Sequence, residues 1–453
     1  MDFHAKEHNW TPQPVAAGIV RNGLNRTLVQ SPWISTFAQR LRDETGTRLV
    51  DWLDHIRIAP DAQFEEAGFV PAAEECQVCW LEHPGGIFPK LVIDDSDALT
   101  TPQLGIKVES IEDFLAAHTD LTPSHTVIGN AGAPLRMATL ALPDGATLHL
   151  VERHGYRGFS LDQTELDFSE LRQQALEQFR KRTRSYNDPA ATFADATERF
   201  ITLNQPQRIS YLCDAFFQTE REFWQANNTA ARIQYARQQK LGLGWANHDH
   251  HTYRCSRQWF APLVAFLELV GFTCRERFYA GREAGWGAQV LEQPDCGLVI
   301  FADVDMSAEE LLGDFSHEGL PAGSDPGTVG LWCQLHGDSF GTAGMHHLEC
   351  QFDFVASQQQ LAQAGIETMA PFTDFPHLKQ AFTKGETWTI PEARLDALVS
   401  ANVITSEDAT RFLNRGAIGS HLEILERNDG FKGFNQTGIS QIILETNPRT
   451  INT

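Results

Sequence analysis

The chain lacks any run of about 18 consecutive apolar residues, the length that a helix needs to cross a bilayer. Its opening segment, MDFHAKEHNW, has no apolar core of the kind found in a secretory signal peptide. Positive charge is also scarce, because 36 Lys and Arg stand against 59 Asp and Glu and the net charge is -23. A chain this acidic repels phosphate backbones and anionic lipid surfaces. We therefore expect a cytoplasmic protein that binds neither nucleic acid nor membrane.

Cysteine motifs are nearly absent. Of eight Cys, only Cys76 and Cys79 form a C-x-x-C pair. A zinc knuckle needs a second pair, and a redox site places the pair at a helix start. Here the surrounding ECQVCWL favours a strand, so we expect reduced structural thiols.

The length of 453 residues predicts two or three domains. Residues 1–45 are expected to form an arm with one helix. Residues 46–165 contain short strand-like runs punctuated by Pro and Gly, and residues 166–240 carry apolar side chains at the three- and four-residue spacings of amphipathic helices. From 241 to 453 the order strand, helix, strands occurs twice, with a helix–loop insertion over 373–415. The predicted fold class is α+β, built from repeated βαβββ modules.

An internal repeat supports this division. The segment 146–159 aligns with 420–434, so that His149 falls on Glu423 and Glu152-Arg153 falls on Glu426-Arg427. Upstream, Asp54-His55 is similar to Asp249-His250. The N-terminal region is therefore predicted to be another βαβββ-like module.

A histidine cluster indicates metal chemistry. In WANHDHHTYRCSR, His248, His250 and His251 lie within four residues, and on a strand His248 and His250 share one face while His251 points the other way. A second pair occurs in GMHHLECQFDF, where His347 begins a strand and His346 is expected to face away. Imidazoles gathered in this way favour a metal over isolated structural histidines.

The third element is the strand GSHLEILER. Glu423 is flanked by apolar residues, and a buried carboxylate is costly unless it is paired or bound to a metal; the alternative is a solvated position at the rim. Two His and one carboxylate, here His250, His347 and Glu423, form a facial triad that leaves positions open on Fe(II). Ligand type alone leaves zinc and manganese open.

These residues carry a resemblance to the vicinal-oxygen-chelate superfamily. HLEILERNDGFKGF is similar to the metal-ligand strand of 4-hydroxyphenylpyruvate dioxygenases. The resemblance implies βαβββ modules that form a half-open barrel around a metal, with residues 166–240 as a helical insert. It also implies that Glu423 rather than Glu426 is the ligand, and that Phe431 lies in the loop lining the pocket.

The motif DHHTYR and the chain length resemble the 2-oxoadipate dioxygenase/decarboxylase (2-hydroxyglutarate synthase) family. Its H-x-x-x-R pattern matches His250 and Arg254, which implies that His250 binds Fe(2+) and Arg254 grips the distal carboxylate of the substrate. The implied partners are a 2-oxo acid and O₂, and the implied reaction is oxidative decarboxylation with hydroxylation. The order of the ligands departs from that family, whose first ligand lies near its N-terminus, and this puts the substrate in doubt.

Other residues near the ligand strands are candidates for substrate binding. Arg254 lies an even number of residues from His250, so both face the pocket on a regular strand, and a guanidinium suits a carboxylate. The alternative for Arg254 is an ion pair that supports the fold. Hydrogen bonds to substrate are further assigned to Ser420, Gln436 and Gln441.

Several alternatives stay open. His55 and His149 could form a second metal site, although a duplicated module more often survives as scaffold without metal. A zinc or manganese lyase, isomerase or hydrolase could use the same fold, and HDHH partly matches a metallo-hydrolase motif whose Asp is replaced by Thr252. A non-catalytic ligand-binding protein is the third alternative, and a homo-oligomer is compatible with all three.

Overall fold

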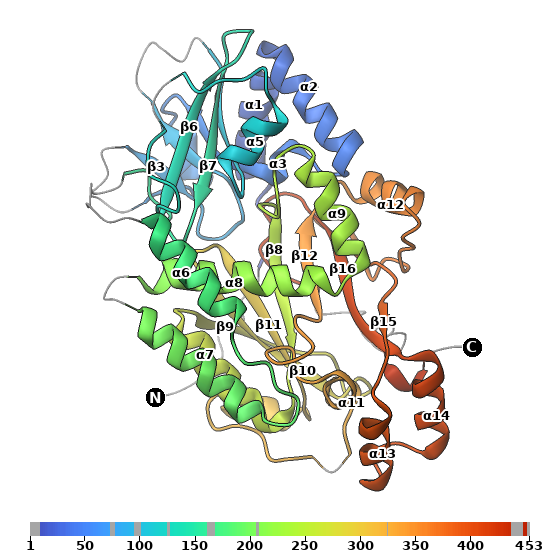
Figure 1. Cartoon of the computed structure of the whole chain (residues 1–453). Helices are drawn as coiled ribbons and strands as arrows, with labels where there is room; N and C mark the ends of the chain where they lie inside the picture. Colours follow the sequence, from blue (N-terminus) through green and yellow to red (C-terminus); the bar gives the residue numbers. More distant parts are fainter. Residues whose placement is uncertain are drawn as a thin grey trace.

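The computed structural model describes residues 10–72, 78–94, 101–124, 127–160, 168–204, 208–323, 325–435 and 447–450. Two large sheets make up most of it, one from each half of the chain, with the helices between them in sequence lying along one side (Figure 1). Cys76 lies outside the described residues, whereas Cys79 is exposed and free.

The C-terminal sheet begins with one complete βαβββ unit. Its elements are β8 (His248–Arg254), α10 (Phe260–Leu269), β9 (Thr273–Tyr279), β10 (Trp286–Gln293) and β11 (Leu298–Asp305). The last strand, β11, returns to lie parallel against the first, β8, and β10 and β9 follow outward in antiparallel order. Helix α10 ends before Gly271, whose positive φ of 96° lets the chain turn back toward the sheet.

A second unit of the same kind completes this sheet. It consists of β12 (His347–Gln351), α12 (Phe354–Gln363), β13 (Thr373–Phe375), β14 (Leu378–Phe382) and β16 (Ala417–Arg427). Between β14 and β16 the chain inserts β15 (Glu386–Trp388), α13 (Glu392–Ser400) and α14 (Ser406–Arg415). Helix α11 (Thr328–His336) connects the two units. The helix–loop insertion expected over 373–415 thus also contains the strands β13, β14 and β15.

The N-terminal sheet contains two units, where one was expected over 46–165. The first comprises β1 (Leu53–Ile58), α4 (Gln63–Glu66), β2 (Val70–Pro71), β3 (Trp80–Glu82) and β4 (Lys90–Ile93). The second comprises β5 (Gln103–Lys107), α5 (Ile111–Ala117), β6 (Leu135–Ala141) and β7 (Thr147–Arg153), with isolated bridges at Pro123 and Ile128 taking the place of one strand. The arm before them folds as α1 (Pro14–Gln30), α2 (Pro32–Arg40) and α3 (Leu49–Trp52).

The four units share one strand order. In each, the first strand pairs in parallel with the last, as in β1 with β4, β5 with β7, β8 with β11 and β12 with β16. Two units then meet through their first strands, β1 against β5 and β8 against β12, both antiparallel. This is the predicted α+β architecture of repeated βαβββ modules, with two open multi-stranded sheets and no closed barrel among the described strands.

The segment predicted as helical forms α6 (Phe168–Arg180), α7 (Pro189–Leu203), α8 (Ile209–Ala226) and α9 (Thr229–Gln239). Asp188 and Asn228 cap α7 and α9 by accepting backbone N–H bonds. The buried face of α8, including Phe216 and Phe217, packs into the same core as α10 and β8. Removing these apolar side chains from water fixes the helices against one face of the C-terminal sheet (Figure 1).

Short helical turns occur at Leu41–Thr45, Arg257–Trp259, Glu310–Leu312 and Pro448–Thr450. Within the described part of the chain, no helix has the length and apolar character that a membrane span requires.

Candidate metal centre

Three neighbouring strands of the C-terminal sheet bring polar side chains to one place. His250 on β8 lies directly opposite Glu349 on β12, and Glu349 lies directly opposite Glu423 on β16. Strand pairing therefore fixes the three Cα atoms in one row across the sheet, with side chains on the same face. All three residues are buried, with exposures of 3%, 1% and 2%.

The donor atoms of this row converge. Donor atoms of His250, Glu349 and Glu423 lie within 4.8 Å of one another. His250 Nε2 is 2.7 Å from Glu349 Oε1. His347, two residues before Glu349 on β12, places its Nε2 2.8 Å from the same oxygen and 3.6 Å from Glu423 Oε2. The three predicted ligands thus come together, joined by a fourth donor.

That fourth donor, Glu349, was missed in the sequence. A signal for it exists, because the tripeptide His-Leu-Glu occurs at 347–349 and again at 421–423. The two copies pair in register on adjacent parallel strands, which sets Glu349 beside Glu423. The side chain two positions after a strand ligand faces the same way, so His347 itself pointed to Glu349.

The protonation of the cluster fits a divalent cation. Burial raises the pKa of Glu423 to about 8, and burial together with the neighbouring Glu423 raises the pKa of Glu349 well above its usual value. Burial lowers the pKa of His250 to about 4, so this imidazole is neutral at pH 7 and available as a donor. Two carboxylates are costly to hold together in a buried site without a positive charge, and a metal ion would supply that charge. The chemistry of the donor set therefore matches a metal centre.

A clamp behind His250 fixes its ring. Asp249 Oδ1 lies 2.8 Å from His250 Nδ1, and Arg427 donates to both oxygens of Asp249 at 2.9 and 3.0 Å. Burial would raise the pKa of Asp249, but Arg427 and His250 outweigh it and hold this pKa below its usual range. The carboxylate therefore accepts the Nδ1 proton and leaves Nε2 as the free donor toward the cluster, the arrangement typical of metal-binding histidines.

A second set of hydrogen bonds orients the carboxylates. Gln380 Nε2 donates to Glu423 Oε1 at 2.8 Å, and Thr252 Oγ1 donates to Glu349 Oε1 at 3.2 Å. Gln380 is held in turn by Thr373, which accepts a hydrogen bond from Asn435. Both carboxylates are thus oriented by neutral donors rather than by cations, and a bound ion would supply the opposing charge.

The cluster lies at a small pocket of about 90 Å³. Six aromatic side chains line much of it, namely Phe278, Trp286, Phe301, Phe372, Phe382 and Phe434. Arg254 and Asp303 also line the pocket, and they are neighbours across β8 and β11. Among the described residues, Arg254 Nε and Nη1 and Asp303 Oδ1 are buried without hydrogen-bond partners. Burial raises the pKa of Asp303 to about 7 despite Arg254.

The other residues predicted to contact substrate, where the structure describes them, do not line the pocket. Ser420 lies an odd number of residues from Glu423, so it faces the other side of β16, where its hydroxyl accepts a hydrogen bond from Asn228. Phe431 packs against Leu378 and Leu425, and Phe434, three residues later, lines the pocket in its place. Gln436 and Gln441 lie outside the described residues.

Of the other histidines, His251 follows the alternation of a regular strand, whereas His248 and His346 do not. His248 was expected to share a face with His250, but the pairing of β8 with β12 shifts between them, and His248 packs on His251 instead. His251 is fully buried against Phe217, as its opposite orientation predicts. His346 lines the pocket beside His347, because β12 begins only at His347 and alternation does not apply before it.

The N-terminal sheet repeats the clamp but not the cluster. His55 Nδ1 lies 2.8 Å from Asp54 Oδ1, and Arg153 donates to that carboxylate, as Arg427 does to Asp249. The residue in register between His55 and His149 is Gly105, in the position that Glu349 holds in the other sheet. A Cβ atom at Gly105 would lie 2.2 Å from the His55 ring, so no side chain fits there.

In the space left by Gly105, His55 Nε2 and His149 Nδ1 lie 2.9 Å apart. Burial lowers the pKa of His149 to about 3. The two imidazoles therefore partner each other as neutral groups, and this half holds neither of the two carboxylates found in the C-terminal cluster.

Comparison with known proteins gives no family-level match: no family model and no curated protein matches the chain. Solved structures resemble it at low identity. A glyoxalase superfamily protein from Ralstonia eutropha JMP134 is 10% identical over 58% of this chain and 93% of its own, with a TM-score of 0.32. 4-Hydroxymandelate synthase from Streptomyces coelicolor is 12% identical over 88% of this chain and 98% of its own, with a TM-score of 0.28. Methylmalonyl-CoA epimerase from Mycobacterium tuberculosis is 11% identical over 40% of this chain and 88% of its own, with a TM-score of 0.23.

Proposed function

We propose that the protein is a non-haem Fe(II)-dependent dioxygenase that oxidatively decarboxylates and hydroxylates a 2-oxo acid. The observation that carries the proposal is the convergence of His250, His347 and Glu423, with Glu349, on a pocket lined by aromatic side chains. Imidazole and carboxylate donors that leave positions open suit Fe(II) oxygenase chemistry. When bound, the iron would supply the activation of O₂ and of the chelated 2-oxo acid.

The number of protein ligands decides which chemistry is available. Three ligands leave three positions open on an octahedral ion, whereas four leave two. A 2-oxo acid that chelates through two oxygens fills two positions, so only the three-ligand set leaves one for O₂. The proposal therefore assigns His250, His347 and Glu423 as ligands and gives Glu349 a place beside the ion.

The remaining pocket residues would bind and orient the substrate. Arg254 offers unpartnered guanidinium nitrogens to a carboxylate at the end of the pocket away from His250, which favours a 2-oxoadipate-like diacid. Gln380 holds the ligand carboxylate of Glu423 in place, and Thr252 holds the neighbouring carboxylate of Glu349. The phenyl and indole walls exclude water from the reacting groups.

A second function is favoured by Glu349 itself. If Glu349 stays bound as a fourth ligand, a zinc or manganese site with two open positions would suit a lyase or isomerase acting on a chelating substrate. A carboxylate that leaves the ion during the reaction would then move a proton to or from the substrate.

The test is anaerobic loading of the purified chain with Fe(II), followed by oxygen-electrode measurements with 2-oxoadipate and with 4-hydroxyphenylpyruvate. We expect substrate-dependent oxygen uptake by the wild type and none by His250→Ala or Glu423→Ala. Stoichiometric zinc in the purified protein, no activation by Fe(II) and no oxygen uptake would overturn the proposal in favour of the second function.

A further inference from the structure

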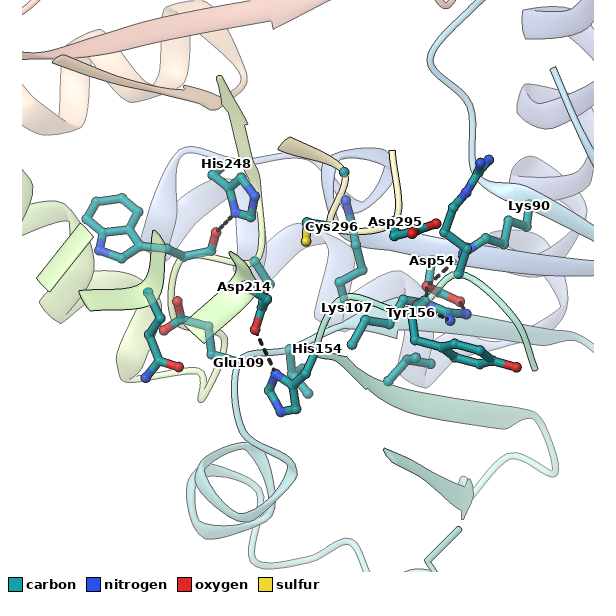
Figure 2. A pocket seen from close by; sticks show the side chains of 18 of the residues that line it. Asp54, Lys90, Lys107, Glu109, His154, Tyr156, Asp214, His248, Asp295 and Cys296 are labelled. Atoms are coloured by element: carbon teal, nitrogen blue, oxygen red, sulfur yellow. Dashed lines mark hydrogen bonds and ion pairs between the residues drawn. The ribbon is translucent and has the colours of Figure 1, made fainter. Parts of the chain in front are cut away.

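A second cavity lies between the two sheets, away from the metal pocket. It has a volume of about 320 Å³ and shares no lining residue with the pocket that holds Glu349 and Glu423. Its walls come from β1, β5 and β7 of the N-terminal sheet, from α6 and α8, and from the start of β8 with the turn between β10 and β11. Three separate parts of the chain therefore meet around this space (Figure 2).

One wall of the cavity carries a buried cation without a partner. Arg221 on α8 is 6% exposed. Its Nε and Nη1 atoms are fully buried, and the described residues provide neither a hydrogen bond nor an ion pair for its guanidinium. An isolated buried charge is expensive, because no opposite charge replaces the water it has lost. Because Arg221 lies on the cavity wall, an anion bound in the cavity would supply its counter-charge.

A second cation comes from the N-terminal sheet. Lys107 ends β5 and lines the cavity, and in Figure 2 its side chain lies between His248 and Lys90. The described part of the chain gives its ammonium group no hydrogen bond or ion pair within contact distance. Burial lowers the pKa of Lys107, and the carboxylates of Asp54, Asp249 and Asp51 act on it in the opposite direction from beyond contact distance.

The other strongly charged pairs in the cavity are already matched. Arg153 is paired with Asp54, and Arg172 is paired with Asp214 at 2.6 Å. His154 also contacts Asp214, at 3.2 Å, as the dashed line in Figure 2 marks.

The remaining acids of the cavity form no close ion pair with these two cations. Burial raises the pKa of Glu109 against the opposing effect of Arg221, and Asp295 accepts a hydrogen bond from Ser210 at 2.8 Å. Neither acid forms an ion pair with Arg221 or Lys107 among the described residues. The cavity thus carries two cations that no hydrogen bond or close ion pair of the described residues engages, in a chain whose net charge is -23.

We propose that this cavity is a binding site for a small organic anion, whose carboxylate or phosphate group is held between Arg221 and Lys107. A guanidinium and an ammonium on opposite walls suit an anionic head group, since both carboxylate and phosphate accept several charge-assisted hydrogen bonds. Trp245, Phe88 and Tyr156 offer aromatic surface to the organic part. The volume suits a molecule of metabolite size.

The test is isothermal titration calorimetry on the full-length chain in Hepes buffer with chloride, using inorganic phosphate and succinate as separate probes. We expect saturable binding of at least one probe, and the tighter of the two identifies the head group as phosphate or carboxylate. Arg221→Gln and Lys107→Gln should each weaken that binding at least tenfold.

Two matched variants separate this site from other basic groups. Arg254→Gln removes the cation of the metal pocket, and Arg282→Gln removes one whose side chain is 82% exposed. Both should leave probe affinity within about twofold of wild type. Arg221→Gln deletes an unpartnered charge, so its melting temperature without anion should equal or exceed that of wild type. The proposal would be overturned if Arg221→Gln and Lys107→Gln bound the probe with wild-type affinity, or if Arg254→Gln lost binding. It would also be overturned if neither probe bound the wild-type protein.

Discussion

Glu349 and Glu423 lie directly opposite each other on the parallel strands β12 and β16, with both carboxylates buried beside His250. This pairing gives the site one carboxylate more than a facial triad requires. Whether Glu349 binds the ion in addition to Glu423 decides between the oxygenase and the lyase or isomerase.

The isosteric variants Glu349→Gln and Glu423→Gln address this choice. We expect Glu423→Gln to lose bound metal and Glu349→Gln to keep it, because the proposed ligands are His250, His347 and Glu423. Metal content of the two purified variants, measured after identical loading, gives the answer. Loss of metal from Glu349→Gln as well would indicate a four-ligand site and favour the second function.

The clamp behind His250 predicts an effect at a distance from the ion. Asp249→Asn should weaken metal affinity roughly 10- to 100-fold, because the amide no longer fixes the Nδ1 proton as Asp249 does. Competition with a chromogenic chelator measures the change. Asp54→Asn, which alters the equivalent clamp of the N-terminal sheet, is the matched control and should leave affinity unchanged. Equal losses in both variants would show that the effect is one of general stability.

Glu423 predicts how the metal-free protein responds to pH. Its pKa is raised from 4.5 in a model peptide to about 8 in the fold, so between these values the folded state binds a proton that the unfolded state has lost. This contribution to stability is fully present below pH 4.5 and is lost as pH rises through 8, by at most about 1.4 kcal/mol per pH unit. Urea unfolding at several pH values should show this decline in metal-free wild type, and a smaller decline in Glu423→Gln. An identical slope in the two proteins would contradict the assignment.

Arg254 predicts the form of the substrate. Arg254→Ala should raise KM for a dicarboxylic 2-oxo acid by roughly 10- to 100-fold, the loss expected for a charge-assisted hydrogen bond, with a smaller effect on kcat. A monocarboxylic 2-oxo acid serves as the control substrate, and its KM should change little. Equal changes for both substrates would give Arg254 the alternative role of supporting the fold with Asp303.

Much of the architecture could be predicted from the sequence, because strand alternation and the repeat of Asp-His and Glu-Arg pairs are local signals. Alternation alone places His250 and Glu423 on pocket-facing positions and sends His251 into the core. It failed for His248, where a register shift breaks the period, and for His346, which precedes its strand. Ser420 was assigned from proximity in sequence, although its odd spacing from Glu423 already pointed it to the other face.

Two features required the three-dimensional register. The role of Gly105 can be recognised only once β1, β5 and β7 are paired. The sequence does not show that the His55 ring occupies the space where a side chain at position 105 would lie. The second N-terminal unit was hidden for a similar reason, since bridges at Pro123 and Ile128 replace one of its strands. Arg221, too, is an ordinary helical arginine in the sequence, and only its burial against the cavity sets it apart.

One metal ion per chain, held by the C-terminal sheet, is what the proposed site requires. Mass spectrometry can measure the metal content per chain after anaerobic Fe(II) loading and desalting, in wild type, in the double variant His55→Ala/His149→Ala and in Glu423→Ala. We expect about one ion per chain in the first two proteins and a near-complete loss in the third. Retention of the ion by Glu423→Ala, or its loss from the N-terminal double variant with the fold intact, would contradict the proposed site.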